Sequence, residues 1–215
     1  MKLSKILACL TVTVFLFSCN STKITSSWKA ENTVNKLYHN IMVWGILPET
    51  DSITRRQMET HLVNDLIDKG YHAVASLDVY KLRAYKKFTA KEIIEEFQST
   101  GVDAVITIVL LNKEKEEKYY PASVFNQPVN QTDNLNRYYS NVYDKVLTPG
   151  YYISTTNYFW EASLFEVGAD KLTYSVRTRS FDPTTTEMLA HENGQLIMKD
   201  MLKQKIILDQ GPKKD

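Results

Sequence analysis

The sequence predicts one α/β domain built on a mixed sheet, with central parallel strands, helices on both faces, a C-terminal antiparallel hairpin and a terminal helix. Two stretches, 39–47 and 103–111, are apolar at both alternating sets of positions, which is typical of strands covered on both sides. A stretch with helical spacing of apolar residues follows the first of them, at 53–69, and another precedes the second, at 89–101. The chain has 215 residues, and we expect a single domain over 36–208.

Three helices are expected in chain order. Residues 53–69 carry Met58, Leu62 and Leu66 at helical spacing and stop at Gly70. The run 54–57 could form a capping box at its start. Asp51, just ahead of this helix, is expected to cap it rather than to belong to a nucleotide site. The second helix opens with the run 89–92 and ends at Gly101, and the third follows the proline and capping signals of 182–187.

The strands are expected to begin in the order 2-1-3. Residues 71–76 form a short strand between the first two helices, and right-handed crossovers would put those helices on opposite faces of the sheet. Residues 151–167 and 171–181 flank a short turn and predict an antiparallel hairpin.

A polar, proline-containing insert occupies residues 112–150, and a polar tail occupies 209–215. The insert begins with alternating charges at 113–118, which we interpret as a strand leaving the core for water.

The first 18 residues have the pattern of a signal peptide. Lys2 and Lys5 precede an uncharged run, 6–17, and small Ser18 precedes Cys19. The run is shorter than the about 20 residues that cross a membrane as a helix. Residues 1–18 are therefore expected to be a targeting segment, and residues 19–35 a polar tether.

The residues Leu16-Phe17-Ser18-Cys19 resemble the lipobox of bacterial lipoproteins. The resemblance implies cleavage before Cys19 and a membrane anchor of acyl chains on its sulfur and amino group. By the same resemblance, Asn20 favours the outer membrane, and the lack of an acidic cluster after Cys19 favours a domain that faces the periplasm. The alternative is a signal peptide cut elsewhere, with Cys19 a free thiol.

A second, more diffuse resemblance covers most of residues 26–200. Trp28, Arg55, Glu59, the run 101–104 and the run 181–183 are similar to landmarks of uncharacterised lipoproteins of Gram-negative envelopes. The outline is also similar to the periplasmic domain of the curli secretion-channel lipoprotein and to the amino-terminal domain of the Tol-system propeller protein. None of these landmarks is a catalytic motif.

Several function classes lack their sequence signals. The net charge of +1 argues against a nucleic-acid binder. The stretch 48–52 has no glycine-rich loop, so no nucleotide is expected. The 4 histidines lie in different predicted elements without metal-ligand spacing, and no nucleophile elbow occurs. No catalytic residue, metal or cofactor is expected, and with Cys9 removed and Cys19 lipidated no disulfide can form.

Two groups of side chains are candidate contacts. Tyr138, Tyr139 and Tyr143 of the insert are candidates for a partner protein or a glycan, because exposed tyrosine offers a large rigid surface with a polar tip. Alternatively they pack the insert against the sheet. Arg177 and Arg179 are candidates for an anion, such as a peptidoglycan or phospholipid carboxylate or phosphate. The alternative for them is a solvated strand face.

These observations together predict an outer-membrane-anchored, periplasm-facing lipoprotein with a non-catalytic binding or scaffolding role. Glycan or peptidoglycan binding by the tyrosine-rich insert is the alternative, and an envelope hydrolase is the third reading. The predicted partners are the membrane, through lipid on Cys19, and an envelope protein or glycan.

Overall fold

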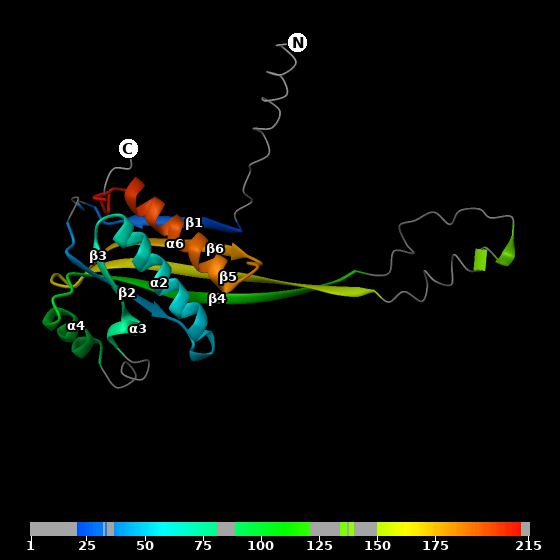
Figure 1. Cartoon of the computed structure of the whole chain (residues 1–215), viewed down its shortest axis with the longest axis horizontal. Helices are drawn as coiled ribbons and strands as arrows, with labels where there is room; N and C mark the ends of the chain where they lie inside the picture. Colours follow the sequence, from blue (N-terminus) through cyan, green and yellow to red (C-terminus); the bar gives the residue numbers. More distant parts are fainter. Residues whose placement is uncertain are drawn as a thin grey trace, which may run out of the picture.

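The computed structural model describes residues 21–31, 33, 37–80, 89–120, 134–136, 138–139 and 150–211. Within them, six strands form one sheet in the order β1-β6-β5-β4-β2-β3 (Figure 1). The strands are β1 (Thr22–Lys29), β2 (Asn40–Ile46), β3 (His72–Ala75), β4 (Ala104–Tyr120), β5 (Tyr151–Glu166) and β6 (Lys171–Phe181). β2 is parallel to both of its neighbours, β3 and β4, and the other pairings are antiparallel. The predicted mixed sheet and its 2-1-3 start are confirmed.

Helices cover both faces of the parallel part of the sheet. They are η1 (Glu49–Asp51), α2 (Ser52–Asp68), α3 (Ser76–Val79), α4 (Ala90–Ser99) and α6 (Thr186–Lys203). Figure 1 shows α2 and α6 side by side across one face, and these two helices also contact each other. The first two predicted helices, α2 and α4, lie on opposite faces, as right-handed crossovers require.

The core has two layers because side chains alternate across a strand. Ile41 and Val43 of β2 face α2 and α6 in the larger cluster, whereas Met42, between them, joins Phe97 of α4 in the smaller one. Both sets of positions in β2 are thus buried, which explains its unbroken apolar run.

The predicted helix starts are confirmed in part. At α4, Thr89 and Glu92 form the predicted capping box. At α2 the cap residue is Asp51, but its side chain accepts no backbone hydrogen bond there and pairs instead with Lys113 at 3.3 Å. The capping box at 54–57 is wrong, because the helix begins at Ser52 and Thr54 is buried inside it. α6 begins after Thr185, whose hydroxyl accepts from the Met188 amide.

The predicted tether contains a strand. Residues 22–29 form β1, which pairs antiparallel with β6 at one edge of the sheet. Its polar side chains bond to α6: Thr22 donates to Glu192 at 2.9 Å, and Ser27 donates to Asp200 at 2.5 Å. The tether prediction is therefore wrong for this stretch. Cys19 lies outside the described residues.

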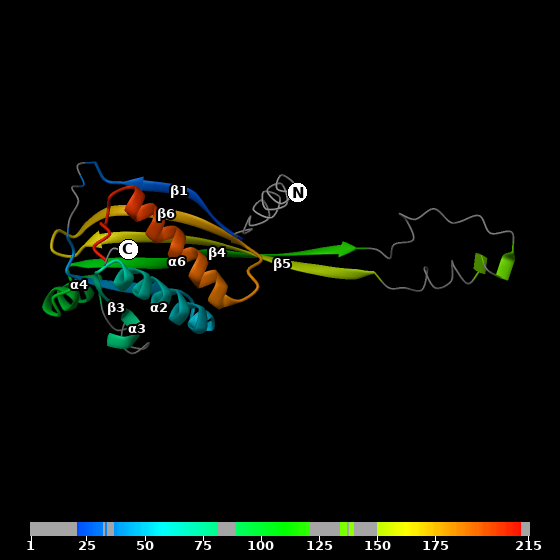
Figure 2. The same cartoon turned by 45° about the horizontal axis from the view of Figure 1, so that its top comes forward.

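The insert begins as a continuation of two core strands. β4 and β5 stay paired as far as Tyr120 and Tyr151, well past the last pairings of β4 with β2 and of β5 with β6. We call residues 112–120 and 151–156 the β4–β5 arm. Figures 1 and 2 show this arm leaving the rest of the domain, so the interpretation of 113–118 as a strand entering water is confirmed.

The predicted antiparallel hairpin is confirmed, since β5 and β6 pair and are joined by a turn at 167–170. No helix within the described ranges is both long and apolar enough to cross a membrane.

Candidate functional site

The β4–β5 arm carries two cross-strand tyrosine pairs near its outer end. Tyr119 lies opposite Tyr152 with ring centroids 4.9 Å apart, and Tyr120 lies opposite Tyr151 at 5.6 Å. Since neighbouring residues of a strand point to opposite faces, the arm shows one aromatic pair on each face. Tyr119 is 50% exposed and Tyr152 is 70% exposed, so these rings remain available for contact.

Charged side chains occupy the arm between the tyrosines and the core. Lys115 pairs with Glu117 at 2.8 Å, Lys113 lies 5.3 Å from the ring centre of Tyr158, and Lys118 lies 5.3 Å from that of Tyr120. The side chains of the Lys115–Glu117 pair are more than half exposed, so water and salt screen it and it contributes little stability. The arm is thus a thin ribbon with solvated charges and an aromatic end.

The structure describes two of the three predicted contact tyrosines. Tyr138 is 43% exposed and Tyr139 is 58% exposed, whereas Tyr143 lies outside the described residues. Both described residues are thus exposed, and their role as contacts stays a prediction.

Arg177 and Arg179 lie two residues apart on β6, and so on the same face of the sheet. The Nε of Arg177 donates to Glu161 at 2.7 Å. Arg179 donates twice to the Oδ1 of Asn157, at 3.2 and 3.0 Å, and lies 5.4 Å from the ring centre of Phe159. Arg179 is thereby held in place, whereas the side chain of Arg177 is 58% exposed.

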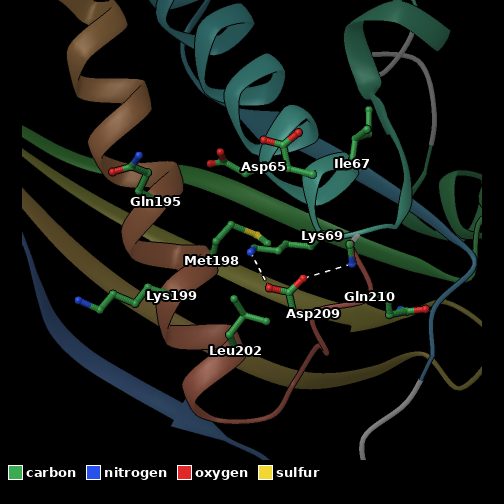
Figure 3. Close-up of a pocket in the computed structure, with 11 residues that line it drawn as sticks. Asp65, Ile67, Lys69, Gln195, Met198, Lys199, Leu202, Asp209 and Gln210 are labelled. Atoms are coloured by element: carbon green, nitrogen blue, oxygen red, sulfur yellow. Dashed lines mark hydrogen bonds and ion pairs between the residues drawn. The ribbon is translucent and has the colours of Figure 1, made fainter. Parts of the chain in front are cut away.

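A groove of about 1230 Å³ runs between α2, α6 and residues 209–211 (Figure 3). Lys69 pairs with Asp209 at 2.7 Å, and the Gln210 amide donates to the carbonyl of Lys69 at 2.9 Å. The Lys69 ammonium lowers the pKa of the Asp209 carboxyl. The predicted polar tail thus begins as one wall of this groove.

Asp65 is a carboxylate of the groove with one buried, unsatisfied oxygen. Its Oδ2 is buried and has no hydrogen-bond partner among the described residues. Burial raises the pKa of this carboxyl, and His191 and His61 oppose the shift. A methyl group on Gly194 of α6 would come within 2.9 Å of that oxygen, so this glycine permits the close approach of the two helices.

Folding brings together two histidines that the sequence placed in separate elements. The rings of His61 and His191 are 5.5 Å apart, and the Nε2 of His61 lies 2.5 Å from Glu187. None of these three residues lines the groove of Figure 3. The described residues hold no group of three His, Cys, Asp or Glu side chains placed to bind a metal.

A buried polar cluster that sequence reasoning missed fastens α2 to the parallel strands. The Oε1 of Glu59 accepts from the Gly45 amide at 2.8 Å, from the Nε of Arg55 at 3.0 Å and from the Ser76 hydroxyl at 2.8 Å, and its Oε2 accepts from the Leu77 amide at 2.9 Å. Glu59 is fully buried. Every polar atom of this carboxylate is occupied, so the cluster positions elements rather than a ligand.

The comparisons with known proteins describe likeness of fold. No protein-family model matches this chain, and no curated protein matches it. Among solved structures, it is similar to a PelC dodecamer from Paraburkholderia phytofirmans, with 11% identity, 88% of this chain and 99% of that chain covered, and a TM-score of 0.45.

Two further solved structures are similar at the same level. Lipoprotein GNA1162 from Neisseria meningitidis has 15% identity, coverage of 77% of this chain and 99% of that chain, and a TM-score of 0.42. A putative neuraminyllactose-binding hemagglutinin homolog from Helicobacter pylori has 11% identity, coverage of 80% and 87%, and a TM-score of 0.35. With TM-scores below 0.5, these likenesses carry no argument about function.

Proposed function

We propose that this chain is a lipid-anchored, periplasm-facing protein of the outer membrane that binds another envelope protein, without catalysis, through the β4–β5 arm. The location is supported by the basic start, the uncharged run and the resemblance of the run 16–19 to a lipobox. The resemblance in outline to the periplasmic domain of the curli secretion-channel lipoprotein, expected from the sequence, agrees with a location in the envelope. The observation that carries the binding function is the projecting arm with tyrosine pairs on both faces.

The arm has the physical properties of a binding surface. A two-stranded ribbon without a third strand or a covering helix is marginally stable in water. Tyrosines supply large contact areas with few rotatable bonds, and they are enriched among the residues that dominate binding energy. A partner that covers Tyr119 or Tyr152 would bury apolar surface and also stabilise the ribbon.

Site-specific photo-crosslinking in the envelope tests this proposal. A photoreactive amino acid replaces Tyr152 in the full chain, and the crosslinked products are identified by mass spectrometry. We expect one predominant envelope protein, and we expect its yield to fall at least tenfold when Tyr119→Ala is added. The same photoreactive group at Phe181, which is 51% exposed on β6, is the matched control. Equal products from both positions, or none from Tyr152, would refute the arm as the binding surface.

Glycan binding by the same aromatics is the second candidate, because the ring faces of Tyr120 and Tyr151 are stacked with an interplanar angle of 13° and a lysine lies beside them. Co-sedimentation of the full chain with insoluble peptidoglycan separates the candidates. Retention that Tyr151→Ala and Tyr152→Ala abolish, together with no protein crosslink, would favour the glycan.

A further inference from the structure

We propose that a hollow on the sheet face of β1, β5 and β6 binds a sugar ring that bears a carboxylate. The hollow has a volume of about 290 Å³ and is lined by Ser26, Trp28, Glu161, Leu172, Ser175 and Arg177. We call it the Trp28 hollow. It is separate from the β4–β5 arm, and it does not depend on the arm's function.

Trp28 forms one wall of the hollow because of its place in the β1–β6 register. It lies directly opposite Ser175, and Ser26, two residues earlier, belongs to the neighbouring row. These serines are short, so they leave open space beside the indole ring, which is 49% exposed. The flat, electron-rich face of an indole suits the C–H face of a pyranose ring.

Arg177 and Glu161 line the hollow in the row next to that of Trp28. They face each other across β6 and β5, with the Arg177 Nε donating to the Glu161 Oε2 at 2.7 Å. Among the described residues this is the one hydrogen bond that the Arg177 side chain donates, and it uses Nε rather than the terminal nitrogens. They form a planar fork that matches a carboxylate. The Glu161 carboxylate can accept bonds from sugar hydroxyls.

The spacing of these two rows suits one substituted ring. The Trp28 row and the Arg177 row are two residues apart along the strands, which is about 7 Å. A ring that stacks on Trp28 would therefore carry a substituent carboxylate over the guanidinium.

The charge of this face favours an acidic sugar over a neutral one. Lys23 lies directly opposite Arg179, so both share the face of Arg177, two residues away on β6. The rows of Arg177 and Arg179 on β1, β6 and β5 thus hold three cations and one carboxylate, that of Glu161. The excess positive charge attracts an anion.

Binding is measured with the full chain in detergent by tryptophan fluorescence and by calorimetry. Trp160 is buried and Trp44 is partly buried, so Trp28 is the most exposed of the three indoles. Two acidic probes distinguish the source of the carboxylate: the N-acetylglucosaminyl-N-acetylmuramic acid disaccharide of peptidoglycan, and digalacturonic acid. Diacetylchitobiose is the neutral control. It has the structure of the peptidoglycan disaccharide but lacks the lactyl group that carries the carboxylate.

We expect saturable quenching by at least one acidic probe and at least tenfold weaker binding of diacetylchitobiose. Arg177→Gln should weaken the acidic probe at least tenfold and remove the preference for acid. Trp28→Ala should abolish binding in calorimetry, and Trp28→Phe, which keeps a ring in place, should restore it to within about fivefold.

Matched controls use similar side chains away from the hollow. Arg56→Gln removes an exposed arginine that pairs with Asp78 on the other side of the fold, and Tyr152→Ala removes an arm ring. Both should leave sugar affinity unchanged within twofold, so loss of the arm's function is distinguished from loss of this site. Equal affinity for diacetylchitobiose, full affinity in Trp28→Ala, or no binding of either acidic probe would overturn the assignment.

Discussion

At the residue scale, the buried Glu59 carboxylate should be the most sensitive single position outside the apolar core. Glu59→Gln keeps the shape but leaves the buried Arg55 guanidinium without its countercharge. Removing one member of a buried ion pair costs about 3–5 kcal/mol. Urea unfolding of the full chain in detergent should show this loss in the free energy of unfolding.

The Lys91–Glu95 pair of α4 is the matched control for Glu59. It has the same (i, i+4) spacing, but its side chains are largely exposed, so Glu95→Gln should cost less than about 0.5 kcal/mol. Similar losses in the two variants would show that the Glu59 cluster does not fasten α2.

Asp65 gives a second prediction at this scale, because its folded-state pKa is raised by burial. Because the folded-state pKa is raised, the protonated form of Asp65 stabilises the fold relative to the charged form. This contribution is fully present below about pH 4, the ordinary pKa of an aspartate. This contribution is lost as the pH rises through the folded-state pKa, and the charged form then lies buried with an unpartnered oxygen.

Asp65→Asn keeps the shape and removes that charge. We therefore expect a higher melting temperature than the native chain at pH 7 and an unchanged one at pH 3, both measured by circular dichroism. His61, His191, Asp68 and Lys69 all act on this carboxyl, and the substitution leaves them in place. A lower melting temperature at pH 7 would mean that the histidines outweigh burial.

At the element scale, the sequence reveals those strands and helices that are stabilised by apolar burial. β2 and the start of β4 are apolar on both faces because helices cover both faces. The start of α4 is indicated by the capping-box residues Thr89 and Glu92. These signals are local, and the structure confirms the elements they predict.

β1 could not be recognised in this way, because its attachment to the domain is polar. Thr22 and Ser27 bond to acidic residues of α6 that lie about 170 residues away in the chain, and Trp28, its largest apolar side chain, is half exposed. A polar stretch that is satisfied by distant hydrogen bonds has the same composition as a tether.

The candidate sites depend even more on distant contacts. The Trp28 hollow requires the register of β1 on β6 and of β6 on β5, and the approach of His61 to His191 requires the packing of α2 on α6. From the sequence, the arm could be predicted only as part of a polar insert. The charges of 113–118 indicate a strand in water, but they do not show how far β4 and β5 stay paired.

At the scale of the whole molecule, the proposed anchor determines which ligands the arm and the Trp28 hollow can meet. Each buried CH₂ group of an acyl chain contributes about 0.8 kcal/mol, and a single myristoyl chain binds only marginally. Several chains on Cys19 would hold the domain at the membrane, within reach of membrane partners and of the adjacent cell wall.

Cys19→Ala tests the anchor directly. Mass spectrometry of the native chain should show a mature amino terminus at residue 19 with acyl chains, and labelling with a fatty acid should mark it. Cys19→Ala should lose the acyl label completely. Cys9→Ala is the matched control, since this cysteine lies in the segment expected to be removed, and it should leave both label and terminus unchanged. A native amino terminus at another residue would contradict the anchor. So would an acyl label that survives in Cys19→Ala, because Cys19 is the one cysteine expected in the mature chain to carry a thioether.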